Sequence, residues 1–406
     1  MSPSYIERSL ETAIRRAACE FPAVVLTGPR QSGKTTLLKH LFGENYGYVS
    51  LEPPDIRATA TFDPRGFLDF HKPPVIFDEV QYAPDLLPYI KERIDEDRSS
   101  TGQYLLTGSQ NLSLMERVTE SLAGRAAMLT LLPLSRRELE GQPDLPLPWE
   151  GTRAVLAGES PICDPWPGFQ RGFFPELAAQ PDRDSGLWHA GYVQTYLERD
   201  VRTLRQVGDL TQFQNFLRVL AARSAQLLNL NDISRDLGVA VNTVKAWLSV
   251  LEATFQIIVL RPYFANIGKR LVKTPKVYFT DVGTLCYLVG LESAEHARRG
   301  PMAGALMETA VIGEIFKTLT HRGIQPRLHF WRTSAGVEVD LLVETGRELI
   351  PVEIKASATP NPSMAKSIRV LGADLSSSVS QGWLVHSGGV TAPLGSGVTA
   401  VPFGRL

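Results

Sequence analysis

Cysteine is scarce in this sequence. Only three cysteines occur among 406 residues, at the widely separated positions Cys19, Cys163 and Cys286. An odd number of scattered cysteines fits neither a disulfide framework nor the close spacing of a zinc site. We therefore expect them to be core or incidental residues.

Long apolar segments are also lacking. No stretch approaches the run of about 20 mainly apolar, uncharged residues that crosses a bilayer. The polar N-terminus, with Glu7 and Arg8, has no apolar core of the kind found in signal peptides. We therefore expect a cytoplasmic protein with no membrane partner.

Charge of one sign is not in excess. The sequence has 42 Lys and Arg residues against 43 Asp and Glu residues, which gives a formal net charge of −1. This excludes a strongly cationic chain, so any contact with nucleic acid must depend on local basic patches. A chain of 406 residues is too long for one ordinary core and predicts two or three domains.

The first 140 residues have the pattern of an α/β domain. Residues 86–94 read as a helix. Four short apolar runs read as buried strands, at 23–26, 48–51, 75–77 and 104–107. Such alternation is typical of a parallel sheet with crossover helices, so we predict one over residues 1–140.

The rest of the chain divides into three segments. Residues 141–185 are rich in Pro and Gly and read as a linker or lid. Helical periodicity dominates residues 186–295 and predicts a helical middle domain. Residues 296–406 combine a helix with later apolar strands at 337–343 and 349–354, which predicts a further α/β domain.

The clearest motif is a phosphate-binding loop between an apolar strand and a plausible helix. It consists of Gly28, Pro29, Arg30, Gln31, Ser32, Gly33, Lys34, Thr35 and Thr36. The glycines let backbone N–H groups turn towards phosphate oxygens, and the helix N-terminus adds partial positive charge. Lys34 would reach the β- and γ-phosphates, and the Thr35 hydroxyl would complete a Mg²⁺ shell. The loop therefore predicts ATP and Mg²⁺ as cofactors, against the alternative of a chance glycine-rich turn.

Two carboxylates follow the apolar strand at 75–77. Asp78 would hold the Mg²⁺ water shell, and Glu79 would polarise the attacking water. An Asp-Glu pair at a strand end is common on protein surfaces. Its occurrence together with the phosphate-binding loop is what indicates a catalytic role.

Two further positions are candidates for sensing or stabilising the γ-phosphate. The run at 104–107 leads to Ser109, our preferred contact, and to Gln110, the alternative; a plain strand-to-loop turn fits equally well. Arg125 is a candidate arginine finger from a neighbouring subunit, although most arginines are solvated surface residues. Such a finger predicts a homo-oligomer with nucleotide at the subunit interfaces.

At these residues the sequence resembles the bacterial and archaeal AAA-superfamily ATPases with a C-terminal domain of unknown function, the family labelled AAA_14 with DUF4143. The resemblance implies an AAA-like P-loop NTPase domain, ATP binding and hydrolysis, and a connection with DNA. In one departure, Phe173 stands where the family has the second of two consecutive glycines, which leaves the local turn geometry open. The resemblance spans nearly the whole chain and rests on residues 28–36, 77–81, 106–110, 123–125, 132–135 and 196–201, and on the C-terminal segments described below.

Residues 230–251 have the form of a helix, a turn at Gly238 and a second helix, which is the helix-turn-helix pattern. One interpretation places the second helix in a DNA groove while basic residues neutralise phosphates. The other is a packing or oligomerisation module, because this fold serves both purposes and the second helix carries only Lys245 as a cation. Strand-like runs at 255–260 and 276–279 would form the wing of a winged-helix domain, with Lys269, Arg270, Lys273 and Lys276 between or beside them.

The C-terminal segment contains carboxylates and a lysine at spacings that resemble the PD-(D/E)XK nuclease fold. They are Glu308, Asp340, Glu353 and Lys355. Side chains alternate along a strand, so Glu353 and Lys355 share one face, and Asp340 joins them if its strand pairs with theirs as a hairpin. In the nuclease-like interpretation Asp340 and Glu353 bind Mg²⁺, Glu308 assists, and Lys355 orients or activates water.

Two other carboxylates are weaker substitutes in this cluster. We expect Glu338 to point to the other face of its strand, and Glu314 lies later on the helix. Both strands are otherwise strongly apolar, so carboxylates buried there need a metal or another partner. A nuclease-derived scaffold without turnover is the alternative to an intact site.

These motifs predict an enzyme. The leading hypothesis is a Mg²⁺-dependent ATPase whose nucleotide state controls a winged-helix domain and a restriction-endonuclease-like C-terminal domain that acts on DNA. The alternative is a nucleotide-gated binding or signalling switch that cleaves nothing. A protein-remodelling ATPase is a third hypothesis, but the sequence has no pore-loop signature for it.

Overall fold

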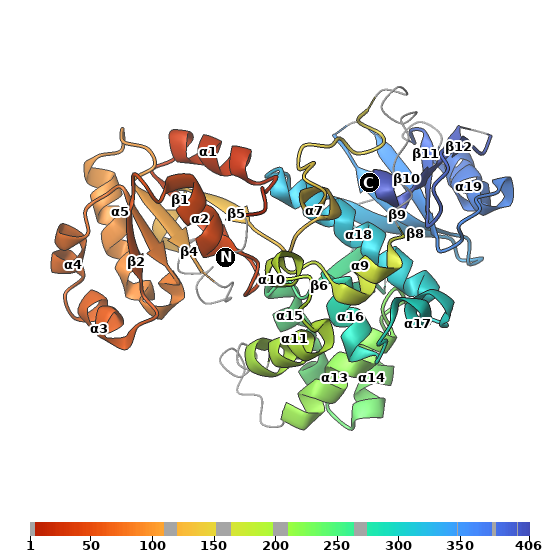
Figure 1. Ribbon diagram of the computed structural model, residues 1–406, viewed down its shortest axis with the longest axis horizontal. Coiled ribbons are helices and arrows are strands. Elements are labelled where there is room, and N and C mark those ends of the chain that lie inside the picture. The colour runs from red at the N-terminus through yellow and green to blue at the C-terminus, as the bar shows by residue number, and fades with distance from the viewer. Residues whose placement is uncertain are drawn as a thin grey trace.

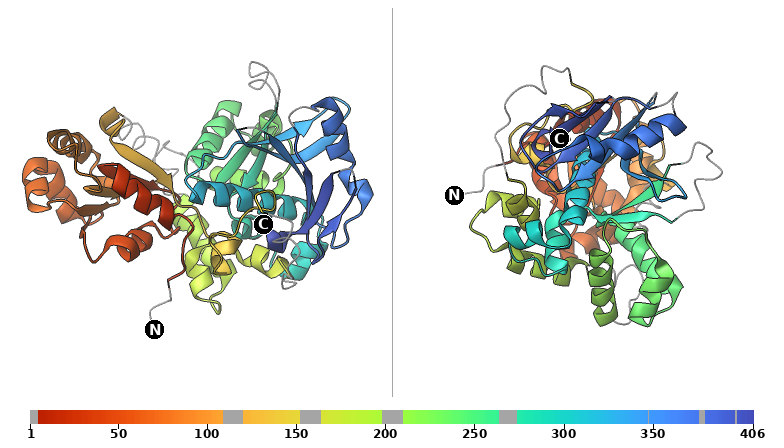
Figure 2. Two further views of the ribbon diagram at one scale, coloured as in Figure 1. Left: turned by 90° about the horizontal axis from the view of Figure 1, so that it is seen from above. Right: turned by 90° about the vertical axis from the view of Figure 1, so that its right-hand side faces the viewer.

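The computed structural model describes residues 5–108, 120–151, 164–197, 210–263, 274–346, 348–375, 379–395 and 397–406. Two β-sheets lie at opposite ends of the molecule, with a group of helices beside the second (Figure 1). Figure 2 shows the same separation from above. We refer to the described residues up to 131 as the N-terminal part, and to those from 134 onward as the C-terminal part.

The first sheet is parallel throughout. Its order is β2-β3-β4-β1-β5, and every neighbouring pair runs in the same direction. This confirms the predicted α/β fold with a parallel sheet. Its strands are β1 (Ala23–Thr27), β2 (Gly47–Ser50), β3 (Val75–Asp78), β4 (Tyr104–Thr107) and β5 (Ala126–Thr130).

Helices cover both faces of the first sheet. In β1, Leu26 packs in one core with α1 and α2, whereas its neighbour Val25 packs in a second core with α4 and α5. Because both faces are buried, the central strands read as continuous apolar runs without alternation. The helices are α1 (Glu11–Glu20), α2 (Lys34–Phe42), α3 (Pro54–Phe62), α4 (Pro64–Phe70) and α5 (Leu87–Glu96), with short 3₁₀ turns at Val80–Tyr82 and Pro84–Leu86.

The second sheet is mixed and larger. Its order is β12-β13-β11-β10-β9-β8-β6-β7. The long helix α18 (Ala303–His321) packs against β7 and β10, and α19 (Lys366–Asp374) packs against β9 and β10 from the opposite face. The strands are β6 (Ile257–Pro262), β7 (Lys276–Phe279), β8 (Leu328–Arg332), β9 (Glu338–Glu344), β10 (Leu349–Lys355), β11 (Gly382–His386), β12 (Ala392–Pro393) and β13 (Val398–Pro402).

The helices before and beside the second sheet share its core. One continuous set of buried apolar side chains runs from Leu134 to Leu406 and includes members of both. These helices and one face of the second sheet therefore share one core, and α19 covers a second core on the other face. Its other helical elements are α7 (Arg136–Leu139), α9 (Trp166–Arg171), α10 (Pro175–Ala179), α11 (Ser185–Tyr192), the π-helix Val193–Leu197, α13 (Leu210–Ala222), α14 (Leu230–Leu237), α15 (Val241–Ala253), α16 (Val282–Leu288), α17 (Ala294–Arg299) and 3₁₀ turns at Pro362–Ala365 and Phe403–Arg405.

The helix-turn-helix segment forms as predicted, but the expected wing differs. Gly238, at φ +65°, ends α14 before α15 begins. Strands β6 and β7 pair with each other, and β6 also pairs with β8, so they are the last two strands of the second sheet. Lys276 is 4% exposed instead of facing DNA. The other expected wing cations, Lys269, Arg270 and Lys273, lie outside the described residues.

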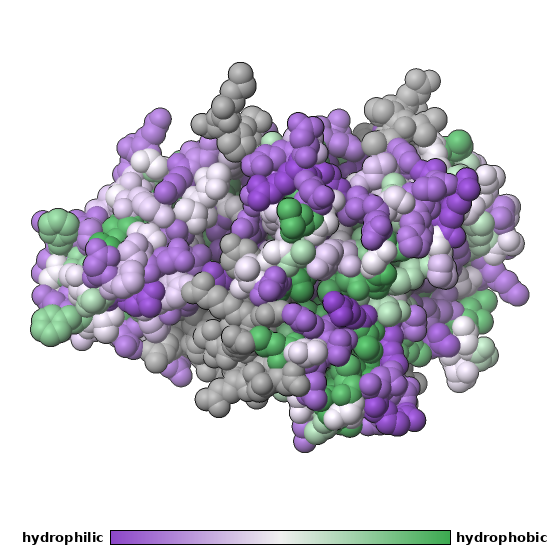
Figure 3. Space-filling model, turned by 60° about the horizontal axis from the view of Figure 1, so that its bottom comes forward, coloured by the Kyte–Doolittle hydropathy of each residue, from purple (hydrophilic) through white to green (hydrophobic). Residues whose placement is uncertain are grey.

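The surface of the described residues mixes hydrophilic and apolar side chains. The face in Figure 3 is mainly hydrophilic, with apolar residues gathered near its lower centre. Among the described residues, Phe62, Phe70 and Leu187 are the most exposed large apolar side chains. Within the described ranges, no helix combines the length and the apolar character needed to cross a membrane.

The departure at Phe173 is accommodated by the glycine before it. Gly172 takes φ +85°, which favours glycine, and lies against Asp281. The Phe173 N–H donates to Asp281 Oδ1 at 2.7 Å, and its buried ring lies 4.7 Å from the Lys317 ammonium. The turn therefore needs a glycine only at the first position.

We expect Gly283→Ala to destabilise the protein by about 1–3 kcal/mol, because a Cβ on this residue of α16 would overlap the Gly172 Cα. The matched control is Gly168→Ala on α9, where a Cβ meets nothing within 4 Å. This control should unfold at the wild-type temperature or slightly above it. Thermal unfolding checks both, and equal midpoints for the two variants would contradict the described packing.

Candidate functional site

The phosphate-binding loop connects β1 to α2. Gly28 has φ +142°, and a Cβ there would overlap the Leu131 carbonyl oxygen, so this position requires glycine. Gly33 has φ +92° and precedes the first turn of α2. The loop therefore wraps around the amino end of α2, where backbone N–H groups and the helix dipole favour an anion.

Lys34 is buried against the loop. Its Nζ donates to the carbonyl oxygens of Gly28 at 3.1 Å and of Pro29 at 2.9 Å. The ammonium is thus held close to the loop backbone, where phosphate binding requires a positive charge.

A cavity of about 590 Å³ lies beside the loop. Glu79 also faces it. The lining includes most of the predicted loop residues, namely Arg30, Gln31, Gly33, Lys34, Thr35 and Thr36. Ser32 is fully buried instead. Six of the nine predicted loop residues and the predicted base therefore face one cavity.

Residues from distant segments also line this cavity. Tyr5, Ile6 and Arg8 reach it from the chain before α1. Pro175 and Ala179 reach it from α10, which belongs to the C-terminal part. No sequence signal pointed to either group, because both are distant from the loop along the chain.

Asp78 lies at the end of β3 and is hydrogen-bonded to three hydroxyl groups. The Thr35 hydroxyl donates to its Oδ1 and the Tyr48 hydroxyl to its Oδ2, both at 2.8 Å, and the Thr107 hydroxyl also donates to Oδ1. Burial and the bond to Asp78 raise the pKa of Tyr48. Thr35 and Asp78, the two residues predicted to hold Mg²⁺ at the nucleotide site, are therefore in direct contact.

Glu79 follows Asp78 in the left-handed conformation, at φ +60°. Its N–H donates to the Thr107 hydroxyl at 3.1 Å, and the Gln81 amide donates to its carboxylate. Sequence reasoning missed Thr107 and Gln81, although both lie in or beside the motifs that it used. A hydroxyl at the end of an apolar strand is the signal that could have identified Thr107.

The remaining predicted residues of this site are not at the loop. Ser109 and Gln110 lie outside the described residues. Arg125 precedes β5 at the edge of the sheet opposite the loop, and it forms two hydrogen bonds with Asp95, at 2.8 and 2.9 Å. Within one chain it therefore cannot reach the nucleotide cavity, and a role across a subunit interface stays a prediction.

The second sheet brings Asp340, Glu353 and Lys355 together. β9 and β10 are antiparallel, with Leu341 opposite Val352, so Asp340 and Glu353 are adjacent across the strands. Lys355 Nζ donates to Glu353 Oε1 at 2.6 Å and lies 3.5 Å from Asp340 Oδ2. The hairpin expected from strand alternation therefore forms, and the lysine lies between the two carboxylates.

Glu308 joins a neighbouring set of charges. It accepts hydrogen bonds from Lys276 at 3.0 Å and from the Tyr278 hydroxyl at 2.5 Å, both on β7. Lys276 also lies 2.5 Å from Glu338. The expectation that Glu338 points to the other face is therefore wrong, because Glu338 lies two residues before Asp340 on the same strand and shares its face. Lys276 was considered only as a wing cation, and its role here depends on β7 joining the second sheet.

Burial changes the ionisation of these carboxyl groups. It raises the pKa of Glu308 and of Glu353 to about 7, with the charge of Asp340 adding to both. It also raises the pKa of Asp340, although Lys355 opposes this. Over the described ranges, no group of three or more His, Cys, Asp or Glu side chains is arranged to hold a metal ion.

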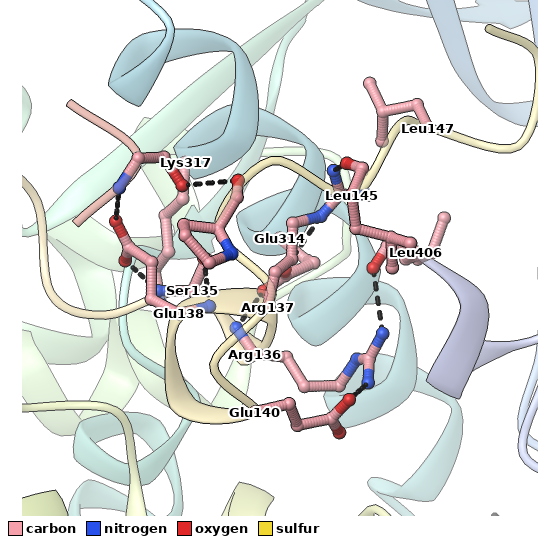
Figure 4. Close-up of polar contacts among 12 residues, drawn as sticks. Ser135, Arg136, Arg137, Glu138, Glu140, Leu145, Leu147, Glu314, Lys317 and Leu406 are labelled. Atoms are coloured by element: carbon pink, nitrogen blue, oxygen red, sulfur yellow. Dashed lines mark hydrogen bonds and ion pairs between the residues drawn. The ribbon is translucent and has the colours of Figure 1, made fainter. Parts of the chain in front are cut away.

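The connection after β5 forms a buried polar junction with α18 (Figure 4). The Arg136 N–H donates to Glu314 Oε2 at 2.9 Å, and Lys317 Nζ donates to the Leu134 carbonyl at 3.1 Å. Arg137 is fully buried 3.7 Å from Glu314 Oε1, and burial lowers its pKa to about 10. Glu314, the other substitute for Glu308, thus belongs to this junction.

Three protein-family models match the chain. An AAA domain, AAA_14, covers residues 20–140. A domain of unknown function, DUF8612, covers residues 169–295, and another, DUF4143, covers residues 303–406. The AAA_14 match includes the first sheet, the DUF8612 match includes the helices α13 to α16, and the DUF4143 match includes α18 and the strands from β8 onward.

Among solved structures, the Walker-type ATPase paby2304 of Pyrococcus abyssi is 16% identical, with a TM-score of 0.44 over 70% of this chain and 96% of that one. RuvB of Thermotoga maritima is also 16% identical, with a TM-score of 0.26 over 62% of this chain and 88% of that one. At these TM-scores neither likeness bears on the argument.

Two curated relatives are much closer in sequence. They are the uncharacterised proteins Rv2008c of Mycobacterium tuberculosis and Mb2031c of Mycobacterium bovis. Each is 31% identical over 400 residues, which is 98% of this chain and 84% of the relative. The resemblance found in the sequence is thereby confirmed, and the chain belongs to the family that joins an AAA_14 domain to DUF8612 and DUF4143.

Proposed function

We propose that this protein binds ATP with Mg²⁺ in the cavity beside the loop and hydrolyses it. One observation carries the proposal: Lys34, Thr35 and Glu79 line a single cavity, and Asp78 is bonded to Thr35 at its edge. The match to an AAA domain over residues 20–140 supports nucleotide binding.

The chain's own groups divide the work of phosphoryl transfer. The loop N–H groups and the Lys34 ammonium would bind the β- and γ-phosphates and stabilise the charge that develops on them. Thr35 and Asp78 offer adjacent oxygen atoms 2.8 Å apart, which suits a hard cation and its water shell. Mg²⁺, when bound, would neutralise phosphate charge. Glu79, held by Gln81, would orient the attacking water and accept its proton.

We expect Glu79→Gln to bind a fluorescent ATP analogue with near wild-type affinity but to hydrolyse ATP about 10²- to 10⁴-fold more slowly, because the variant retains shape and lacks the base. Lys34→Ala should lose both binding and hydrolysis. The control is Glu44→Gln, an exposed residue after α2. Wild-type turnover by Glu79→Gln would eliminate Glu79 as the base.

A second candidate function, metal-dependent cleavage of DNA, belongs to the C-terminal part. This function is supported by the position of Asp340, Glu353 and Lys355, which lie close together on two adjacent strands. These strands belong to a mixed sheet that α18 and α19 cover. Lys355 lies between the carboxylates, so a metal would have to displace its ammonium. The alternative is a nuclease-like scaffold that cleaves nothing and serves a nucleotide-gated switch, in which Lys355 and Lys276 simply neutralise the carboxylates.

Cleavage of supercoiled plasmid separates these two possibilities. If the site is active, wild-type protein should nick DNA with Mg²⁺ or Mn²⁺, and Asp340→Ala and Lys355→Ala should each abolish nicking. Glu348→Ala, an exposed carboxylate just before β10, is the matched control. Nicking that persists in Asp340→Ala and Lys355→Ala comes from elsewhere, and a wild-type protein that never nicks favours the switch.

Glu353 also makes stability depend on pH. Its pKa is about 7 in the folded protein against an ordinary value of 4.5, so the folded state binds the proton more tightly. Stability therefore falls as pH rises from about 4.5 to about 7, and the loss is complete above that range. In metal-free buffer we expect Glu353→Gln to melt about 2 °C or more above wild type at pH 8, with most of this gain absent at pH 5. The control Glu348→Gln should show no such difference, and an equal gain for Glu353→Gln at both pH values would contradict the raised pKa.

A further inference from the structure

Arg8 joins the phosphate-binding loop to the connection after β5. It lies just before α1 and is 4% exposed. Its Nη1 donates to the Ser32 carbonyl at 2.9 Å, and its Nη2 donates to the Leu132 carbonyl at 2.8 Å. One guanidinium therefore satisfies a loop carbonyl and a carbonyl 124 residues away along the chain from Arg8.

The loop needs a donor at this position. When backbone N–H groups turn inward around a phosphate, neighbouring carbonyl oxygens turn outward and require partners of their own. Ser32 is 0% exposed, so water does not reach this carbonyl in the folded protein. Without Arg8 the Ser32 carbonyl would be buried and unsatisfied, which disfavours this loop conformation.

Glu138 fixes Arg8 in place. Its Oε1 lies 3.2 Å from Arg8 Nε and accepts the Ser9 N–H at 2.9 Å, and its Oε2 accepts the Ser135 N–H at 2.8 Å. Burial alone would raise the pKa of Glu138, but the charge of Arg8 and the contact with His321 keep it well below its ordinary value. Glu138 is therefore ionised and paired with Arg8.

His321, on α18, closes the other side of Glu138. Its Nδ1 lies 3.1 Å from Glu138 Oε1, and its Nε2 accepts the Leu132 N–H at 3.1 Å. Because Nε2 is an acceptor, the proton of the neutral ring is on Nδ1 and faces Glu138. Burial lowers the pKa of His321, which agrees with a neutral ring. The carboxylate that holds Arg8 is thus itself held by a helix of the DUF4143 segment.

We propose that Arg8 is a positioning residue of the nucleotide site, and that Glu138, braced by His321 of α18, sets its position. The inference rests on the proposed binding of ATP. Both terminal nitrogens of Arg8 donate to backbone carbonyls, so Arg8 holds the loop in place at the edge of the cavity that it also lines. The C-terminal part therefore helps to shape the loop that binds ATP.

If the ion pair of Arg8 and Glu138 only stabilises the fold, nucleotide affinity should recover together with the melting temperature. If Arg8 positions the loop, affinity should stay low when the melting temperature recovers. Arg8→Met leaves the Glu138 charge buried without its partner, so it should lower both thermal stability and nucleotide affinity. The double variant Arg8→Met with Glu138→Gln removes the unpaired charge, and its single amide oxygen can still accept the N–H of Ser9 or of Ser135, although not both. It should recover part of the melting temperature but still bind nucleotide about tenfold more weakly, because Ser32 and Leu132 lack their donor.

Two measurements on the full chain decide the outcome: the melting temperature without nucleotide, and titration with a fluorescent ATP analogue and Mg²⁺. Arg8→Lys is a milder variant that retains the charge but cannot serve both carbonyls, so it should lose affinity with a smaller loss of stability. Arg16→Met, an exposed arginine of α1, is the matched control. If the double variant and Arg8→Lys both bind like wild type, Arg8 has no positioning role. If wild type itself does not bind the analogue, the proposed ATP site fails, and this inference fails with it.

Discussion

The buried charges between residues 134–138 and α18 constrain the rest of the structure. Arg137, Glu138 and Glu314 are almost completely shielded from water. A buried charge without a partner is strongly destabilising, so each one depends on a group that another segment must deliver. Arg8 comes from the N-terminal part and pairs with Glu138, whereas Glu314 comes from α18 and pairs with Arg137. The contacts of this junction therefore fix how the two parts of the chain are placed.

That placement determines what the nucleotide cavity contains. The loop, the Asp78 end of β3 and Glu79 are features of the first sheet alone, but α10 closes the cavity from the C-terminal part. A Cβ placed on Gly33 of the loop would lie 3.7 Å from Cγ of Pro175, which belongs to α10. A ligand in this cavity would contact both parts and stabilise their association, and by linkage their association would strengthen its binding. The cavity thus includes residues outside the segment matched by the AAA domain, among them Arg8 and Pro175.

Local sequence patterns predicted the contacts between residues that lie close along the chain or on one hairpin. The loop, the pair Asp78 and Glu79, and the meeting of Asp340 with Glu353 and Lys355 are of this kind, because strand alternation and a known turn chemistry fix them. The roles of Arg8 and Lys276 were not predictable, since each depends on tertiary packing between distant segments. The distance of Arg125 from the loop could have been predicted in part. Arg125 precedes β5, which is parallel to β1, whereas the loop follows β1, so the two lie at opposite edges of the sheet. The two strands expected in the wing form and pair with each other, but their attachment to the second sheet was not predictable, because β6 pairs with β8, more than 60 residues later.

The charges of the second sheet have no evident purpose in folding alone. Glu308, Glu353 and Asp340 all have raised pKa values, so keeping them ionised at neutral pH opposes folding. Lys276 and Lys355 reduce this cost but do not remove it, because burial remains the largest effect on each carboxyl group. Apolar side chains of similar size would fill a sheet face at least as well without the desolvation penalty.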